Sequence, residues 1–230
     1  MKKSERNVLL RQIARQIKNA LLPRDAQFRR LPFGLARGVV MQVNFQRDTL
    51  RYMGFYEIEL SKHFRNLVHR GFKCFDVGGK DGYDALLLAK LSGGIIVSFE
   101  CDPMAAETMR NTFARNPYQI SVIETFVSNE SNERCLTLDD AVTKTFIPDF
   151  VKIDIEGEEA KALLGAQHLL SHRTPNLLIE VHGMEQEMLC LEILRDCGYD
   201  PMLINQRRWL KENRPLLHNR WLVCQGRDPM

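Results

Sequence analysis

The sequence lacks the features of membrane, secreted and zinc-ribbon proteins. No apolar run approaches the roughly 18 residues of a transmembrane helix, and the start, MKKSERNVLLRQIARQIKNALLPR, has no uninterrupted apolar core or small-residue cleavage site. The six cysteines (74, 101, 135, 190, 197 and 224) form no CxxC pair and no Cys/His ligand spacing, and most lie in apolar segments. We therefore expect reduced thiols in a cytoplasmic protein without a transmembrane segment.

A strong positive charge is also missing from the main body of the chain. Residues 1–37 hold 10 Lys and Arg against 2 Asp and Glu, whereas residues 38–230 hold 22 against 27. A mildly acidic body argues against a groove for nucleic acid. The chain has 230 residues, enough for one complete core, and we expect an N-terminal helical arm over 1–55 followed by one domain over 56–230.

The basic arm is predicted to begin with an amphipathic helix that ends near Pro23. Its apolar positions, repeated at helical spacing, are Val8, Leu9, Ile13, Ile17 and Leu21. We expect this helix to pack on the main domain as a lid. The alternative is a weak peripheral contact with an anionic membrane or an acidic partner.

Strand and helix patterns alternate through the rest of the chain, after connecting structure at 25–50 and a helix at 57–70. The expected strands lie near 72–77, 95–100, 120–127, 149–155, 176–182, 201–206 and 219–225. The expected helices lie near 82–92, 103–115, 157–171 and 185–197. Nearly continuous apolar strands in such an alternation predict an α/β fold, with a mostly parallel sheet covered by helices on both faces. No apolar helix joins the last two strands, which should form an antiparallel pair at the sheet edge.

The segment from Phe72 to Glu100 is typical of a strand, a glycine-rich turn, a helix and a second strand. The turn, GGKDG at 78–82, does not fit the dinucleotide pattern GxGxxG in any register. Its charged surroundings are Asp76, Asp81, Asp84 and the single cation Lys80. Such acidity repels a pyrophosphate but suits a sulfonium and an ammonium, so we expect S-adenosylmethionine rather than NAD, with Glu100 accepting hydrogen bonds from ribose hydroxyls. The alternative is a tight turn with a helix-capping acid.

A group of polar residues is expected beside that pocket, at the carboxyl edge of the sheet. The strand near 72–77 should neighbour the one near 149–155, which should neighbour the one near 176–182, so the group comprises Asp154, Glu156, Glu180 and His182. His182 is the first candidate for taking up the proton of an acceptor hydroxyl. Asp154 is the alternative base, or the group that holds the methionyl ammonium.

Two further interpretations concern the same segment. Glu158 and Glu159 are expected only to stabilise the start of the following helix. A divalent metal held by Asp154, Glu156 and His182 is an alternative that the spacing of these residues does not support.

Several segments occur in the order and at the spacing of a known family, over about Tyr56 to His182. They are FDVGGKDGYDALLLAKL, VSFECDP, TLDDAV at 137–142, DFVKIDIEGEEAKALLGAQHLL at 149–170 and LLIEVHG at 177–183. Together they resemble the FkbM-type family of S-adenosylmethionine-dependent class I methyltransferases. The resemblance implies a Rossmann-like, seven-stranded sheet with an antiparallel edge strand. It also implies methylation of hydroxyl groups on sugars, polyketides and related small molecules.

The residues and the resemblance together give the candidate site. Asp154 and His182 are the candidates for catalysis. The candidates for binding the cofactor are Glu57, Asp76, Gly78, Gly79, Lys80, Gly82, Tyr83, Glu100, Asp102, Ser128 and Asp154. Family members usually have Asn at the position of Lys80 and an apolar residue at that of Asp81. Lys80 should therefore pair either with the methionyl carboxylate or with Asp81.

The segment QRRWLKENRPLLHNR at 206–220 indicates the kind of acceptor. Its basic residues, around Trp209, are Arg207, Arg208, Lys211, Arg214 and Arg220. Arginine binds carboxylates and phosphates and Trp packs on sugar faces, so we expect an anionic or glycan acceptor, with a solvated loop as the alternative. Two other functions stay open, an NAD-dependent dehydrogenase and a non-catalytic nucleoside-binding adaptor.

Overall fold

The computed structural model of the protein describes residues 23, 25–207, 209–210, 212 and 218–226. Within these residues, no helix has the length and hydrophobicity of a membrane span. The basic amphipathic helix expected before Pro23 lies outside them. The chain divides into two compact units, Met1–Ile58 and Glu59–Met230.

The described part of the first unit contains an antiparallel pair of short strands and one short helix. β1 (Gln27–Arg30) pairs with β2 (Val40–Val43), and α2 (Thr49–Tyr52) follows. The sequence predicts only connecting structure at 25–50, and this expectation was wrong. Strands of four residues are too short to display a period of two against their surroundings.

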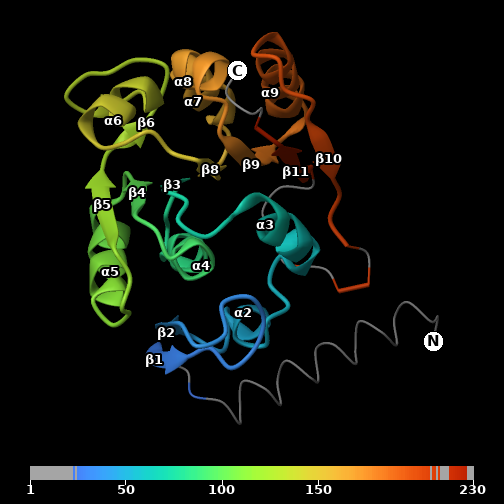
Figure 1. Ribbon diagram of the computed structural model, residues 1–230. Helices are drawn as coiled ribbons and strands as arrows, with labels where there is room; N and C mark the ends of the chain where they lie inside the picture. The colour runs from blue at the N-terminus through green and yellow to red at the C-terminus, as the bar shows by residue number, and fades with distance from the viewer. Residues whose placement is uncertain (1–22, 24, 208, 211, 213–217, 227–230) are drawn as a thin grey trace. The chain divides into compact units, whose positions relative to one another are not determined.

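The second unit is built on a seven-stranded sheet with the strand order β10-β11-β9-β8-β3-β4-β5 (Figure 1). The strands are β3 (Cys74–Val77), β4 (Ile96–Glu100), β5 (Ile120–Glu124), β8 (Phe150–Ile153), β9 (Asn176–His182), β10 (Met202–Ile204) and β11 (Asn219–Cys224). The strands from β9 to β5 are parallel, and β11 is antiparallel to both of its neighbours. The predicted neighbours of β8 and the predicted antiparallel pair at the edge are confirmed.

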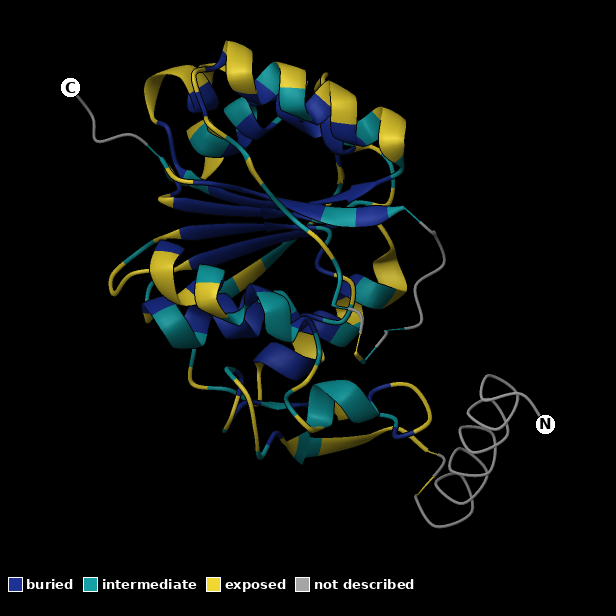
Figure 2. Cartoon of the chain, turned by 90° about the vertical axis from the view of Figure 1, so that its right-hand side faces the viewer, coloured by how far each residue is buried: buried dark blue, intermediate teal, exposed yellow. Residues whose placement is uncertain are grey.

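Helices cover both faces of this sheet (Figure 2). One face carries α3 (Ser61–Leu67), α4 (Tyr83–Ser92) and α5 (Pro103–Phe113), and the other carries α6 (Leu138–Lys144), α7 (Glu159–Leu164), α8 (Gln167–His172) and α9 (Met184–Asp196). Every residue of β3 and β8 is buried as a result. Two charged residues inside these strands, Asp76 and Lys152, are only 1% and 0% exposed. Charged side chains buried in this way need partners that replace their lost hydration.

Two helices differ from the expectation. The helix predicted at 157–171 is divided into α7 and α8 at Gly165, where a Cβ would lie 2.1 Å from the carbonyl oxygen of Ser128. The helix α6 was not predicted, although the TLDD sequence contains its start signal. Oγ1 of Thr137 accepts a hydrogen bond from the backbone N–H of Asp140 at 3.1 Å, and so caps α6.

The strand predicted at 120–127 also ends early. β5 stops at Glu124, and β6 (Phe126–Val127) leaves the main sheet to pair with β7 (Cys135–Leu136). The N–H of Thr125 donates to the carbonyl oxygen of Glu100 at 3.0 Å. This turn brings the segment after β5 to the carboxyl end of β4.

Candidate functional site

A pocket of about 630 Å³ opens at the carboxyl ends of β3, β4 and β8. Sites for small molecules usually have volumes of roughly 300–1,000 Å³. Six residues that the sequence indicates for the cofactor line this pocket: Gly78, Lys80, Glu100, Asp102, Ser128 and Asp154. They come from three strand ends and from the segment after β6, so the fold gathers residues that are far apart in the chain.

The glycine-rich turn after β3 packs directly on the neighbouring strand ends. The N–H groups of Gly78 and Gly79 donate to the carbonyl oxygen of Phe99, at 2.9 and 3.0 Å. Gly78 has a φ of 90°, and a Cβ there would lie 1.9 Å from the carbonyl oxygen of Asp154. Glycine is required because an L side chain disfavours this φ and would collide with backbone. The turn therefore reaches Asp154 in the pocket wall.

Glu100, the last residue of β4, uses both carboxylate oxygens to hold the backbone around the pocket. Oε2 accepts a hydrogen bond from the N–H of Lys80 at 2.7 Å, and Oε1 accepts one from the N–H of Asp102 at 2.8 Å. Asp102 in turn caps α5, since its Oδ1 accepts from the N–H of Met104 at 2.8 Å. A carboxylate has about four acceptor positions. Glu100 can therefore also accept hydrogen bonds from the hydroxyl groups of a ligand.

Asp76 lies within β3 and is not among the residues that line the pocket. Its Oδ2 accepts a hydrogen bond from Oγ of Ser98 at 2.6 Å. Burial, together with the negative charge of Asp84, raises the pKa of Asp76 to about 7, although the bond from Ser98 opposes the shift. The side chain of Asp76 thus joins β3 to β4, and a direct contact with the cofactor stays a prediction.

Lys152 is a buried cation that sequence reasoning missed. Its side chain is 0% exposed, and its Nζ lies 3.3 Å from Oδ2 of Asp84 and 3.5 Å from Oδ2 of Asp154. A buried ammonium is stable only when carboxylates or hydrogen bonds replace its lost hydration. The available signal was a lysine inside FVKI, a strand segment covered on both faces. Lys152 holds one oxygen of Asp154 and so orients this carboxylate.

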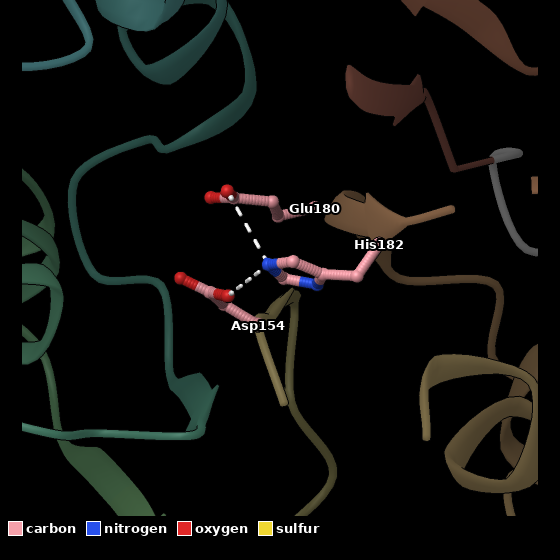
Figure 3. A group of neighbouring side chains, drawn as sticks. All are labelled: Asp154, Glu180 and His182. Atoms are coloured by element: carbon pink, nitrogen blue, oxygen red, sulfur yellow. Dashed lines mark ion pairs between the residues drawn. The ribbon is translucent and has the colours of Figure 1, made fainter. Parts of the chain in front are cut away.

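Three side chains from the ends of β8 and β9 converge beside the pocket, as expected from the strand order (Figure 3). Nε2 of His182 lies 3.6 Å from Oδ1 of Asp154 and 3.6 Å from Oε1 of Glu180. The other ring nitrogen, Nδ1, lies 2.6 Å from Oε1 of Glu159. A carboxylate only accepts hydrogen bonds, so Nδ1 carries a proton. Nε2 is therefore the ring atom that faces Asp154 and Glu180.

The surrounding carboxylates determine the charge of His182. Burial favours the neutral ring, but the hydrogen bond to Glu159 and the negative charges of Asp154 and Glu180 outweigh it. The pKa of His182 is therefore raised above its ordinary value of 6.5. The protonation of His182 therefore depends on the three carboxylates of Asp154, Glu159 and Glu180.

The role expected of Glu159 was too narrow. Glu159 does lie in the first turn of α7, and its Oε1 accepts a hydrogen bond from the N–H of Gly157 at 2.9 Å. However, its side chain is 0% exposed and the same oxygen contacts His182. The run of acids in IEGEE does not distinguish a side chain that faces solvent from one that turns toward β9, so the sequence missed this contact.

The comparisons with known proteins agree with the motifs. Residues 107–201 match the family model of the methyltransferase FkbM domain. The methyltransferase FkbM of Methylobacillus flagellatus KT is a similar solved structure, with a TM-score of 0.55 and 21% identity over 67% of this chain and 43% of that chain. The resemblance to the FkbM family is confirmed. The match spans less than half of the Methylobacillus protein, and no curated protein matches the chain.

Two further structures extend the likeness in fold. An S-adenosylmethionine-dependent O-methyltransferase of Thermotoga maritima has a TM-score of 0.55 and 12% identity, over 75% of this chain and 66% of that chain. A Streptococcus mutans protein in complex with SAH (S-adenosylhomocysteine) has a TM-score of 0.53 and 14% identity, over 74% of this chain and 97% of that chain. The chain therefore has the Rossmann-like class I methyltransferase fold. The family match, over residues 107–201, is to a methyltransferase domain.

Lys80, where the chain departs from the FkbM pattern, has a partner that the sequence did not indicate. Its Nζ lies 3.0 Å from Oε1 of Glu156, across the pocket between the β3 and β8 loops. Both residues have a positive φ, 52° for Lys80 and 51° for Glu156, which is uncommon outside glycine. The ion pair joins two strained loops, and Glu156 is thereby separate from the group around His182.

The remaining candidates for the cofactor lie outside the pocket wall. Gly79 packs behind the turn, where a Cβ would lie 2.2 Å from Cε of Met109. Gly82 is the N-cap residue of α4, and Tyr83 is its first residue. Glu57 lies in the first unit. Their roles in binding stay predictions.

The loop at 206–220 is described only in part, and Arg208, Lys211 and Arg214 lie outside the described residues. Arg207 is only 6% exposed in its side chain, and its guanidinium contacts the carboxylates of Glu59 and Glu212. Trp209, in contrast, is 67% exposed. Between these two described residues, Trp209 is therefore the accessible one.

Proposed function

We propose that the chain is an S-adenosylmethionine-dependent O-methyltransferase whose acceptor is a hydroxyl group of a sugar, a glycan or another small molecule. The observation that carries this proposal is the position of Asp154. This residue lies in the wall of the pocket, and its Oδ1 also faces Nε2 of His182 at 3.6 Å. A ligand in the pocket and a group that handles protons are thus neighbours.

The residues of the pocket fit the proposed cofactor. Its described wall carries five carboxylates (Glu100, Asp102, Asp154, Glu156 and Glu158) and two ammonium groups (Lys80 and Lys161). Such an excess of negative charge favours a cationic ligand over a diphosphate. Glu100 would hold the ribose, and Asp154 would lie near the methionyl group. When bound, S-adenosylmethionine supplies a methyl group activated by its sulfonium.

The chain itself contributes orientation and proton uptake. Lys152 fixes Oδ2 of Asp154, which leaves Oδ1 directed at the group around His182. Because Nδ1 of His182 is held by Glu159, Nε2 is the atom at which this ring can take up the proton of an acceptor hydroxyl. A hydroxyl that loses its proton at this point is a better nucleophile, and holding it in line with the methyl carbon supplies most of the remaining rate.

The chemistry of the acceptor follows from the same region. The exposed Trp209 offers a face on which a sugar ring can pack. This loop also contains Arg208, Lys211 and Arg214, which lie outside the described residues. Their positive charges would suit an anionic substituent on the acceptor. The proposal includes a cytoplasmic location and no partner nucleic acid, as expected from the cysteines and from the acidic body of the chain.

Calorimetric titration of the full chain with S-adenosylhomocysteine, and separately with NADH, tests the proposal. We expect binding of the first ligand only, and weaker binding by Glu100→Gln. Glu124→Gln is the matched control, since Glu124 is the register partner of Glu100 on β5 and does not line the pocket. Transfer of labelled methyl groups to a panel of sugars and nucleotide-linked sugars then tests the acceptor. Failure to bind S-adenosylhomocysteine at millimolar concentration, or preference for NADH, would overturn the proposal.

A further inference from the structure

We infer that Asp154, Glu180 and His182 form a binding site for one divalent transition-metal ion, of the class that Mn²⁺ represents. The inference deepens the proposed function, and its catalytic part rests on that function. Binding of the ion by these three side chains can be tested without any methyl transfer.

The first observation is the spacing of the three ligand atoms. One atom from each side chain lies within 4.8 Å of the others, and Nε2 of His182 is 3.6 Å from each of the two carboxylate oxygens. A hydrogen bond would bring such atoms to roughly 2.7–3.2 Å. Two ligands that share an ion, each at about 2.1 Å, are separated by roughly 3.0–3.6 Å at ordinary bond angles. The observed distances suit a shared ion better than a direct hydrogen bond.

The second observation is the state of Nε2 itself. The side chain of His182 is only 5% exposed, and its Nε2 lies 3.6 Å from a carboxylate oxygen of both Asp154 and Glu180, within ion-pair distance but too far for a hydrogen bond to either. Figure 3 shows this nitrogen directed into the space between the carboxylates of Asp154 and Glu180. Two carboxylates that converge on one imidazole nitrogen repel each other, and a positive charge between them would offset this repulsion. An ion between the three side chains would supply that charge.

Each of the three ligands is also held from behind, as metal ligands usually are. Glu159 accepts from Nδ1 of His182 at 2.6 Å, and so fixes the tautomer that presents Nε2. Nε1 of Trp221 donates to Oε2 of Glu180 at 3.1 Å, and Nδ2 of Asn219 donates at 2.6 Å to Oε1, the oxygen that faces His182. Lys152 holds the oxygen of Asp154 that faces away from the group. These contacts set the orientation of all three side chains before any ion arrives.

The chemistry of the ligands indicates the class of ion. Imidazole suits Zn²⁺, Fe²⁺ and Cu²⁺, and carboxylates suit Mg²⁺ and Mn²⁺, so one nitrogen with two oxygens selects a first-row ion that accepts both. Three carboxylates, from Asp154, Glu180 and Glu159, surround the imidazole. The ammonium of Lys152 beside Asp154 offsets one of these negative charges, and the excess that is left favours an added positive ion. Because Asp154 also lines the pocket, an acceptor hydroxyl could bind the ion there. The ion would make that hydroxyl a stronger acid. Because Nε2 of His182 would then bind the ion, the proton would pass to the carboxylate of Asp154, the alternative base.

Manganese titration of the metal-free full chain, followed by electron paramagnetic resonance, tests the inference. We expect one bound Mn²⁺ per chain and at least about tenfold weaker binding by His182→Gln and by Asp154→Asn. Glu159→Gln, which alters only the group behind His182, should weaken binding by about 10–100-fold. Glu124→Gln, which changes a carboxylate on another strand, should bind like the wild type. Near-ultraviolet circular dichroism shows which variants are folded.

A crystal soaked in Mn²⁺ gives a second measurement that needs no variant. An anomalous peak between Nε2 of His182 and the oxygens of Asp154 and Glu180 supports the inference, and a soaked crystal without that peak overturns it. Folded variants that bind Mn²⁺ as tightly as the wild type also overturn it. If S-adenosylhomocysteine binds but Mn²⁺ does not, the methyltransferase proposal survives and the metal site falls. If Mn²⁺ binds but S-adenosylhomocysteine does not, the reverse holds.

Discussion

Replacement of Gly78 by alanine tests whether the turn after β3 shapes the pocket through its backbone. The added Cβ would lie 1.9 Å from the carbonyl oxygen of Asp154, whereas ordinary contacts begin at 3.4 Å. The two loops must therefore move apart by more than an ångström. This movement would strain the hydrogen bond that the N–H of Asp154 donates to the carbonyl oxygen of Val77 at 2.9 Å.

Two effects set the magnitude of this change. A left-handed φ with an L side chain costs roughly 1–2 kcal/mol. Forcing extra atoms into a packed region adds about 1–3 kcal/mol. Gly71→Ala is the matched control, because Gly71 has a φ of 86° and a Cβ there meets nothing within 4 Å. The free energy of unfolding should fall by about 2–5 kcal/mol for Gly78→Ala, but only by about 1–2 kcal/mol for Gly71→Ala.

Urea denaturation of the two variants measures the stability difference, and calorimetry with S-adenosylhomocysteine measures the effect on the pocket. Gly78→Ala should bind this ligand at least about tenfold more weakly, which corresponds to roughly 1.4 kcal/mol. Gly71→Ala should bind it like the wild type. Equal losses of stability in the two variants, or unchanged binding by Gly78→Ala, would refute the view that contact between the turn and Asp154 defines the pocket.

Three further predictions concern the same region. Glu100→Gln should lower the free energy of unfolding by about 1–3 kcal/mol, because an amide cannot accept from both N–H groups, and a thermal melt with unchanged midpoint would contradict this. The raised pKa of Asp76, about 7, means that its contribution to stability is complete below its ordinary value of 3.8 and is lost as the pH rises through 7. Urea midpoints between pH 4 and 8 should therefore fall less steeply in Asp76→Asn, and parallel curves would count against the shift. Lys80→Ala should change the free energy of unfolding by less than about 1 kcal/mol, because the side chains of its ion pair, Lys80 and Glu156, are 75% and 64% exposed. A larger loss of unfolding free energy in urea denaturation would show that the pair holds the two loops together.

The strand order could be predicted from the sequence because long apolar strands alternate with helices. That pattern leaves few arrangements, and the order around β8 follows once the connections are right-handed. The short elements β1, β2 and β7 could not be predicted, since their backbone hydrogen bonds depend on partners that only the folded chain supplies. The break at Gly165 also involves a distant segment, since the carbonyl oxygen of Ser128 approaches the chain there.

The sequence predicts which strand ends form the site, but it does not predict the direction in which each side chain points. Glu100, Asp154 and His182 follow from the rule that ligands bind at the carboxyl edge of a parallel sheet. The same rule does not predict the roles of Lys152 and Glu159. A charged residue in a strand or in the first turn of a helix is usually expected to face solvent, whereas both of these side chains are buried. The partner of Lys80 was missed for another reason. Glu156 is 76 residues away, and the contact depends on two loops with a positive φ.

Cross-strand register, more than loop conformation, fixes the polar groups of this site. Asp76 bonds to Ser98, its register partner on β4, and Glu180 bonds to Trp221, its register partner on β11. A slip of one residue in either pairing would turn these side chains to the opposite face of the sheet. Glu180 and His182, which both lie in β9, are therefore positioned by the sheet itself. Differences in acceptor between related chains should then arise in segments outside the sheet, such as 206–218. An exchange of that segment with a relative should change the acceptor and leave binding of S-adenosylhomocysteine intact.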